Sequence, residues 1–375
     1  MRLEDLVGQE RAVAVLRNAL RRDRVAHAYL FSGPQAVGKS TAAFLFAQVL
    51  NCERDGDETP CGTCRSCKLI ERSSHPDVRL VTVGADARGR RRSEISIDQI
   101  RQNPRKPRET PLPLIQDASL KAAMGPYKVY LIDPADRMRA EASNALLKLL
   151  EEPPPHVVII LVTSEPSGLL PTVVSRCQQV LFRLAGSDDI EEHLVKLGTA
   201  PAVATSLARL SGGRIAWAIR GARRPELLET RTALLDVCAD IGRHGLPASV
   251  RIAEEIKLRA AQLAQADSEA EQQGEGEDEA TPAAVAGDRA VREELPWCLD
   301  IMVSWYRDLL AIGEGSPLLN PDYEKALKRQ FRPQLVAQSQ CAVESILETK
   351  HAIQRNANID VALESLVIGL VGACD

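Results

Sequence analysis

The chain has 375 residues, of which 45% are hydrophobic and 3% aromatic, and its formal net charge is −4. This length allows two or three domains and a sizeable buried core. The slightly acidic balance and the scarcity of aromatic residues argue against a base-stacking single-strand binder, and any contact with nucleic acid needs local basic patches.

The chain begins with Met1-Arg2-Leu3-Glu4-Asp5, which lacks the apolar stretch of a secretion signal. No run approaches the roughly 20 apolar residues that span a bilayer. Val157–Val162, for example, has only the length of a strand. We therefore expect a cytoplasmic protein without a membrane partner.

Apolar runs alternate with helical patterns through the first half of the chain. The runs that predict buried strands are 28–31, 78–83, 128–132 and 157–162. Helices are predicted over 39–50 and 140–152, and the second must end at Pro153-Pro154-Pro155 because proline lacks the amide donor. This alternation predicts an α/β fold, with a parallel sheet covered by helices on both faces.

From Ser187 onward the strand signal disappears. Residues 187–221 predict a small set of helices with a break at Gly212-Gly213, and the pattern beyond Pro225 is helical to the end. The exception is 267–287, which is rich in Glu, Gln, Gly and Ala. Such a segment buries too little apolar surface to order itself, so we predict a flexible acidic loop there.

A phosphate-binding loop is predicted between the first strand and the first long helix. Gly33-Pro34-Gln35-Ala36-Val37-Gly38-Lys39-Ser40 matches the pattern G-x-x-x-x-G-K-[ST]. The glycines let backbone amides turn toward phosphate oxygens, and the helix N-terminus adds partial positive charge. Lys39 is expected to neutralise the phosphates, and Ser40, followed by Thr41, to hold magnesium. The pattern predicts bound ATP or ADP with Mg²⁺; the alternative is a chance glycine turn.

The acid that normally activates water is missing from the second nucleotide motif. The strand Val129-Tyr130-Leu131-Ile132 is followed by Asp133, suited to position magnesium, and then by Pro134 in place of glutamate. Loss of a general base typically removes about 10²–10⁴ of rate. Asp136, three residues further on, is expected to cap the helix that follows; the alternative is that its carboxylate reaches the site. Nucleotide binding without strong hydrolysis is the prediction, and an ordinary core strand ending in an exposed aspartate is the alternative.

Four cysteines, Cys52, Cys61, Cys64 and Cys67, form the pattern C-x8-C-x2-C-x2-C. Four thiolates can close a tetrahedral site, the geometry of structural zinc. An iron–sulfur cluster and unligated core cysteines are the alternatives. The other cysteines lack such spacing and are predicted to be small buried apolar residues: Cys177, Cys238, Cys298, Cys341 and Cys374.

Basic residues occur in two further places. Arg176, in Val174-Ser175-Arg176-Cys177, is either a solvated charge or an arginine finger for nucleotide on an adjacent subunit, a role that needs a planar and permanent charge. A second group is either a solvated loop or a phosphate-contact surface. Its members are Arg88, Arg90, Arg91, Arg92, Arg101, Arg105, Lys106 and Arg108.

Several of these motifs follow one another in the order found in a known family. They are residues 27–34 (HAYLFSGP), the four-cysteine insert, residues 144–154 (NALLKLLEEPP) and residues 175–177 (SRC). Across about residues 3–183 the chain thereby resembles the AAA+ subunits of the bacterial clamp loader, the part of DNA polymerase III that places the sliding clamp on primed DNA.

The resemblance implies three domains. These are a RecA-like AAA+ P-loop domain at 1–183 with a zinc-binding insert at 52–67, a helical lid at 184–222 and an all-α collar at 223–375. It also implies that Arg176 completes the ATP site of a neighbouring gamma/tau subunit, that Thr163 is the sensor-1 residue, and that Val7-Gly8-Gln9 hold the adenine end.

Two departures favour the delta-prime type over the gamma/tau motor. Pro134 replaces the glutamate of the motor, and Ala216 aligns with its sensor-2 arginine; Arg214 or Arg220 takes that role only in another register. The resemblance therefore implies a stator in a hetero-pentamer with gamma/tau and delta, acting with the clamp and primer–template DNA at the nucleoid-associated replisome. A gamma/tau-type motor ATPase and a nucleotide-gated scaffold outside replication are the alternatives.

Overall fold

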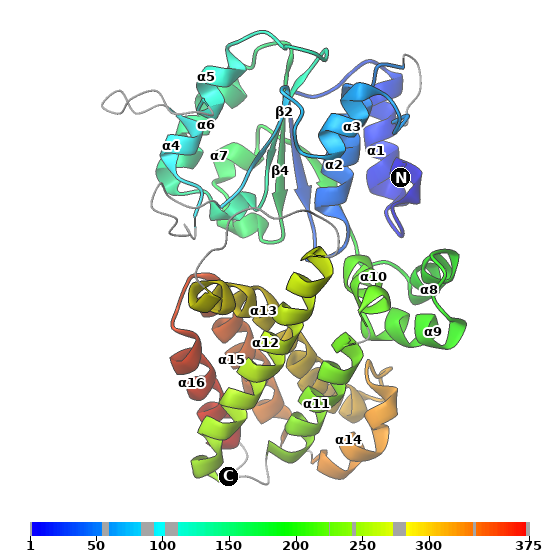
Figure 1. Cartoon of the computed structure of the whole chain (residues 1–375), viewed down its shortest axis with the longest axis vertical. Helices are drawn as coiled ribbons and strands as arrows, with labels where there is room; N and C mark the ends of the chain where they lie inside the picture. The colour runs from blue at the N-terminus through cyan, green and yellow to red at the C-terminus, as the bar shows by residue number, and fades with distance from the viewer. Residues whose placement is uncertain are drawn as a thin grey trace. The chain divides into compact units, whose positions relative to one another are not determined.

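The computed structural model describes residues 2–54, 60–83, 94–101, 112–224, 226–241, 245–272, 283–332 and 335–372. By its internal contacts the chain divides into two units, Met1–Ile219 and Arg220–Asp375 (Figure 1). The expected boundary between lid and collar, at 222/223, lies close to this division, and the expected boundary at 183/184 lies inside the first unit.

Five parallel strands in the order β2-β3-β4-β1-β5 form the centre of the first unit. The strands are β1 (Ala28–Ser32), β2 (Val78–Val81), β3 (Lys128–Ile132), β4 (Val157–Thr163) and β5 (Gln178–Leu181). The first four confirm the predicted strands, although β2 ends two residues earlier than expected. The edge strand β5 was not predicted, because only Val180 of its four residues is buried and the apolar signal is weak.

Successive side chains of the central strands enter two different cores. Tyr29 and Phe31 of β1 point to one face of the sheet, whereas Ala28 and Leu30 point to the other. This alternation follows from the period of two along a strand. The first face is covered by α1 (Glu10–Arg21) and α2 (Lys39–Leu50), and the second by α6 (Ala140–Glu151) and α7 (Pro171–Val174), as Figure 1 shows. The predicted parallel sheet with helices on both faces is confirmed.

Shorter elements complete the sheet domain. They are η1 (Leu3–Asp5), α3 (Arg65–Glu71), α4 (Ile97–Ile100), α5 (Leu114–Ala118), η2 (Ala135–Arg137) and η3 (Pro166–Gly168). The helices predicted for 187–221 follow the last strand as α8 (Ser187–Lys196), α9 (Pro201–Leu210) and α10 (Ile215–Arg223). Gly212 and Gly213, both with positive φ, separate α9 from α10, so the predicted break is confirmed.

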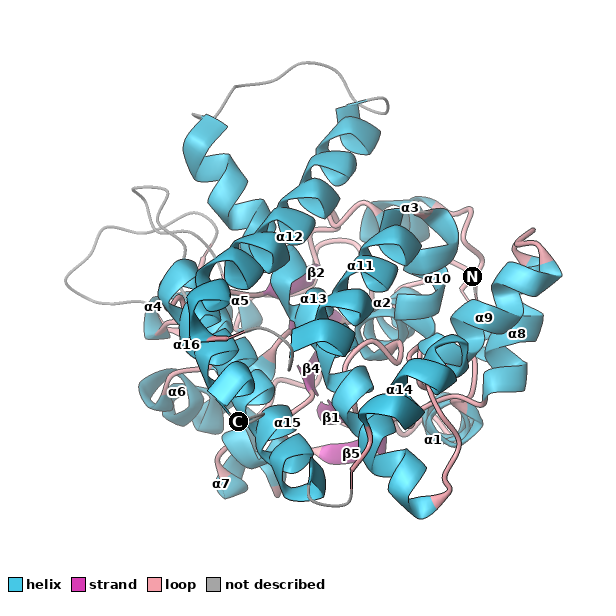
Figure 2. Ribbon diagram, turned by 90° about the horizontal axis from the view of Figure 1, so that it is seen from below, coloured by secondary structure: helices cyan, strands magenta, loops and turns pink. Residues whose placement is uncertain are grey.

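The second unit is helical throughout its described residues, as predicted (Figure 2). Its elements are α11 (Glu226–Asp240), η5 (Leu246–Ala248), α12 (Ser249–Gln272), α13 (Ala283–Glu314), η6 (Pro321–Tyr323), α14 (Glu324–Gln330), α15 (Leu335–Gln354) and α16 (Ile359–Gly372). Its core includes the fully buried Trp305. The carboxylate of Asp308, also fully buried, accepts the backbone N–H groups of Leu319 and Asn320 at 2.8 and 2.6 Å and so ties the chain after α13 back to this helix.

The predicted acidic loop at 267–287 differs from the structure at both ends. The helix α12 continues to Gln272 and α13 begins at Ala283, so helical backbone replaces loop over these stretches. Residues 273–282 lie outside the described residues. The stretch has little apolar surface to bury, but the run of Ala, Glu and Gln that continues α12 has high helix propensity. Among the described residues, no helix combines the length and the apolar character needed to cross a membrane.

Candidate nucleotide, metal and arginine sites

Three predicted site elements meet at one edge of the sheet. In the strand register, Ser32 at the end of β1 pairs with Thr163 at the end of β4, and Ile132 at the end of β3 pairs with Leu161. Because the carboxyl ends of parallel strands share one edge, the glycine loop after β1, Asp133 after β3 and Thr163 lie together there. The sheet itself therefore assembles the site.

The glycine loop needs its glycines for backbone reasons. Gly38 has a φ of 96° immediately before α2, a conformation that L side chains rarely adopt. Gly33 has a φ of 147°, and an added Cβ there would collide with the carbonyl oxygen of Phe182. The loop thus passes close against the residue after β5 and turns into the N-terminus of α2, where unpaired amides favour an anion.

A cavity of about 380 Å³ opens over this loop. Of the residues predicted to bind phosphate or magnesium, and of the predicted sensor, its lining contains all but Gly33, and it adds residues from the strand ends and from α10. The lining residues are Gln35, Ala36, Gly38, Lys39, Ser40, Thr41, Asp133, Pro134, Val162, Thr163, Ser164 and Ala216. The structure therefore brings the sequence-predicted side chains together at one hollow.

Lys39 lies at the centre of this hollow with 6% of its surface exposed. Its ammonium group donates hydrogen bonds to the carbonyl oxygens of Gly33 and Pro34 at 2.8 and 2.6 Å, and to Ser164 Oγ at 3.0 Å. Burial lowers the pKa of Lys39 to about 8, although the nearby carboxylates of Asp133 and Asp136 oppose this shift. The lysine is thus a buried cation whose hydrogen-bond acceptors are all neutral. A phosphate oxygen, which is negatively charged, is a stronger acceptor and can replace them.

The two predicted magnesium groups are in direct contact. Ser40 Oγ donates to Asp133 Oδ2 at 2.5 Å. Burial raises the pKa of Asp133, and the hydrogen bond from Ser40 together with the charge of Lys39 offsets part of that rise. A hydroxyl and a carboxylate at adjoining positions are the hard oxygen donors that Mg²⁺ takes from protein, with waters and phosphates completing its octahedron. The residues present fit a magnesium–nucleotide complex.

Asp136 does not cap the following helix, which corrects the expectation from the sequence. Thr163 Oγ1 donates to Asp136 Oδ1 at 2.5 Å, and the N-cap residue of α6 is Arg139. Asp136 lies in η2, whose tight turn after Asp133 directs this carboxylate toward the end of β4. Sequence reasoning also missed Ser164, whose place one residue after the predicted sensor was the available signal.

Pro134 and Ala216, the two residues in which the sequence departs from the expected motor pattern, both line this cavity. Pro134, whose side chain accepts no proton, lines the hollow beside Asp133, and Ala216 lines it from α10, with its N–H bonded to Ala36 O at 3.0 Å. Arg214 is not among the lining residues, and Arg220 forms an ion pair with Glu294. Of Ala216, Arg214 and Arg220, the cavity lining therefore includes Ala216 alone.

Gln9 belongs to the segment expected at the adenine end. Its side chain is 3% exposed, donates from Nε2 to Arg183 O at 2.7 Å and accepts from Arg183 N at 3.0 Å. The amide of Gln9 thus fixes the start of the chain to the segment between β5 and α8, and its own polar atoms are already paired. Val7 and Gly8 do not line the cavity described above.

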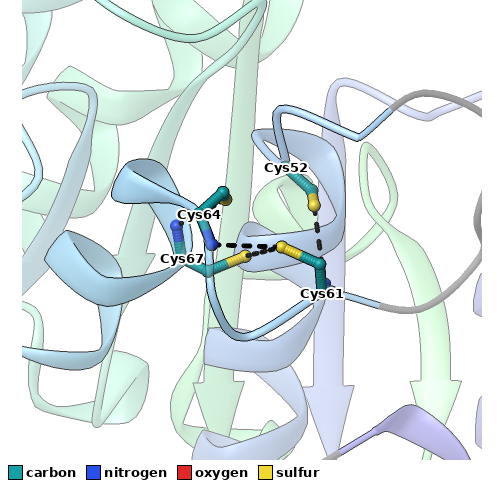
Figure 3. A group of neighbouring side chains, drawn as sticks. All are labelled: Cys52, Cys61, Cys64 and Cys67. Carbon is teal, nitrogen blue, oxygen red and sulfur yellow. Dashed lines mark hydrogen bonds between the residues drawn. The ribbon is translucent and has the colours of Figure 1, made fainter.

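Four sulfur atoms converge in the predicted metal insert. The Sγ atoms of Cys52, Cys61, Cys64 and Cys67 all lie within 4.8 Å of one another, and no disulfide joins them (Figure 3). A tetrahedral zinc ion with Zn–S bonds of about 2.3 Å places its sulfur ligands about 3.8 Å apart, close to the 4.0 Å between Cys61 and Cys67. The donor set and its spacing fit a single tetrahedral ion. Residues 55–59 of the insert lie outside the described residues.

Backbone amides surround these sulfur atoms. The N–H groups of Cys64 and Cys67 donate to the Sγ atoms of Cys61 and Cys64, each at 3.3 Å, as the dashed lines in Figure 3 partly show. The hydrogen bonds from Cys64 and Thr63 lower the pKa of Cys61 to about 6, whereas burial raises the pKa of Cys67. The Cys61 thiolate is stabilised in this way, and the thiolate is the form of cysteine that binds metal.

The remaining cysteines only partly match their prediction. Cys238 and Cys298 are fully buried, which confirms the expectation for them. Cys341 is exposed and Cys177 is half-buried, so the prediction was wrong for the first and incomplete for the second. Cys341 lies on the solvent-exposed side of α15. The lack of metal-ligand spacing, on which the prediction rested, carries no information on burial. Cys374 lies outside the described residues.

Arg176 is located between α7 and the edge strand β5, away from the cavity. Its Nη2 donates to Glu151 Oε1 at 2.7 Å and its Nη1 to Thr172 O at 3.0 Å, and its side chain is 36% exposed. Arg176 therefore lies beside the edge strand of the sheet. Of the second basic group only Arg101, which is exposed, is described; the others lie outside the described residues.

Comparisons with known proteins give a consistent picture. Residues 8–185 match the family model described as DNA polymerase III, delta subunit. The chain is 28% identical over 365 residues to the DNA polymerase III subunit delta-prime of Bacillus subtilis, and this match covers 96% of both chains. It is 39% identical over 196 residues to the tau subunit of the same organism, covering 52% of this chain and 31% of that one.

A solved structure of a gamma-subunit-related protein from Thermotoga maritima covers 97% of this chain and all of its own, at 14% identity and a TM-score of 0.41. The likeness to delta-prime thus runs through both units of the chain. The likeness to tau is confined to about half of it, and this chain spans less than a third of the length of that tau protein.

Proposed function

We propose that the chain is a member of the delta-prime family of DNA polymerase III subunits, and that it acts within the clamp loader of that polymerase, helping to place the sliding clamp on primed DNA. The match with a delta-prime subunit over 96% of both chains carries the proposal. A cytoplasmic site of action at the replication fork, with gamma/tau, delta, the clamp and primer–template DNA as partners, follows from this role.

Within that complex we propose a stator that hydrolyses little ATP itself. Pro134 and Ala216 stand where a motor has its general base and its sensor arginine, and both line the cavity. Arg176, outside the cavity and partly exposed, supplies the charge for the ATP site of an adjoining gamma/tau subunit. Because all parts of the phosphate loop are in place, the chain is proposed to bind ATP or ADP with Mg²⁺ through Gly33, Gly38, Lys39, Ser40, Thr41, Asp133 and Thr163.

The isolated chain is expected to show negligible ATP turnover, since loss of a general base alone typically removes about 10²–10⁴ of rate. In contrast, adding it to gamma/tau and delta is expected to raise DNA-dependent ATP hydrolysis. Steady-state ATPase assays of the chain alone and of the reconstituted complex test both points. Rapid turnover by the chain alone, abolished by Lys39→Ala, would favour the gamma/tau-type motor instead.

Nucleotide affinity is expected to fall as the pH rises above 8. Lys39, whose pKa is lowered to about 8 by burial, is protonated below that pH and must take up a proton to bind phosphate above it. The dissociation constant for ADP therefore rises about tenfold between pH 7 and pH 9, as linkage requires for one proton. Titration calorimetry at both pH values measures the change. The control Lys39→Arg keeps its positive charge at both pH values, so its affinity for ADP is expected to be the same at both. An affinity of the wild-type protein that is equally independent of pH would contradict the prediction.

We propose that the four cysteines hold a structural zinc ion. The sulfur spacing suits one ion, whereas the thiolates of an iron–sulfur cluster bind different iron atoms and stand further apart. When bound, the ion would cross-link the four thiolates and fix the fold of the insert. Cys67, on α3, and Cys52, just after α2, would then be joined through the metal, in addition to the hydrogen bond from Gln48 Nε2 to Cys67 O.

A further inference from the structure

Glu151 holds the guanidinium of Arg176 at the rim of the sheet domain. The ion pair, at 2.7 Å, joins residues 25 apart in the sequence that belong to different elements. The pair of Lys196 with Glu192, in contrast, connects neighbouring turns of one helix and is 68% exposed on both sides. The Arg176 pair is less exposed, and a second bond from Nη1 to Thr172 O fixes the other end of the guanidinium group.

Both anchors stand on backbone that the core fixes. Glu151 is the last residue of α6, directly after the buried Leu149 and Leu150. Thr172 lies on α7, next to the fully buried Val173. An arginine side chain has many rotamers, and fixing one in advance lowers the entropy lost when it binds. The two anchors therefore define the direction of a side chain that would otherwise sample the solvent.

The guanidinium also keeps donors free. Arginine has five N–H donors, of which the two bonds above use one on Nη1 and one on Nη2. The others, that of Nε included, make no hydrogen bond within the described part of the chain. An exposed ion pair is weak, whereas an arginine bond to phosphate is charge-assisted and can be bidentate. The pair can thus orient Arg176 without competing seriously with a phosphate.

We propose that Glu151 is a positioning residue that pre-orients Arg176 toward the triphosphate of the nucleotide bound by the adjoining subunit. This inference rests on the proposed function, and it adds the residue on which the geometry of the arginine depends. Glu151 acts only through Arg176 and does not itself contact the nucleotide. Its contribution appears in the rate of hydrolysis at the neighbouring site and not in nucleotide binding by this chain.

The test is ATP hydrolysis by the complex reconstituted with gamma/tau and delta. In that complex Glu151→Ala is expected to lower the rate of ATP hydrolysis at the adjoining gamma/tau site about three- to fivefold, the size of one exposed ion pair, with KM for ATP unchanged. Glu151→Gln keeps an acceptor oxygen and is expected to recover part of the loss. Glu152→Gln is the matched control, because Glu152 is the next residue and has no ion pair among the described residues; it is expected to behave as wild type.

A double substitution separates the positioning role from a general structural one. In the Arg176→Ala background, Glu151→Ala is expected to cause no further loss, since the two residues act as one unit. A further loss, a raised kcat, or wild-type kinetics for Glu151→Ala alone would each overturn the inference while leaving the proposed function in place. Full activity of Arg176→Ala would instead overturn both.

Discussion

Replacing Arg176 with alanine is expected to lower ATP hydrolysis at the adjoining gamma/tau site by about 10³-fold, the lower bound for loss of an arginine finger. The complex then loses the share of its turnover that this site provides. The physical reason is that the transition state spreads negative charge over the transferred phosphoryl oxygens, and only a planar, permanently charged group matches them with paired donors. Single-turnover ATP hydrolysis by the reconstituted complex measures the effect.

Two comparisons make this prediction specific. Arg176→Lys keeps a charge without the planar fork and is expected to remain close to the alanine variant. Arg139→Ala removes another arginine of the same unit that is paired with a glutamate, Glu94, at 2.7 Å, and is expected to leave hydrolysis unchanged. The role in trans is refuted if Arg176→Ala and Arg139→Ala give the same turnover. Intact assembly of the complex, checked by size-exclusion chromatography, is required of every variant.

The sequence was sufficient for most of the sheet domain because its strands are buried on both faces. Runs such as Val157–Val162 are apolar at every position, and the glycine loop between 28–31 and 39–50 fixes the order of strand, loop and helix. The edge strand β5 escaped because an edge strand exposes much of its surface, and Gln178 and Gln179 carry no apolar signal. An apolar pattern reports burial, and most residues of β5 are exposed. The prediction therefore failed at this strand.

The candidate-site residues also differ in how far the sequence could predict them. Residues joined by a contiguous motif, such as Lys39 and Ser40, were predictable because one turn of chain determines their geometry. The contact of Thr163 with Asp136 and that of Arg176 with Glu151 join residues 27 and 25 apart. Such pairs follow from how the strand ends and helix ends meet, which no local pattern encodes. The structure therefore added the partners of the predicted residues more than the residues themselves.

Removal of the metal is expected to unfold the insert and to spare the sheet. Without the ion, no common ligand holds together the four sulfur atoms that lie within 4.8 Å of one another, and structural zinc in small domains contributes on the order of 10 kcal/mol to folding. The helix α3 has only seven residues, too few to be stable alone. Cys67→Ser is therefore expected to lower the zinc content from about one ion per chain to near zero and to remove the hydrogen-exchange protection of α3.

The loss should end at α2, because Phe46 and Leu50 of that helix are buried in the core against the sheet. The exchange protection of β1 and β4 is accordingly expected to stay at the wild-type level. Cys341→Ser, at an exposed cysteine outside the insert, is the matched control and is expected to retain the metal. Stoichiometric iron with sulfide in place of zinc would contradict the single-ion site, and unchanged protection of α3 after chelation would show that the four thiols fold without any metal.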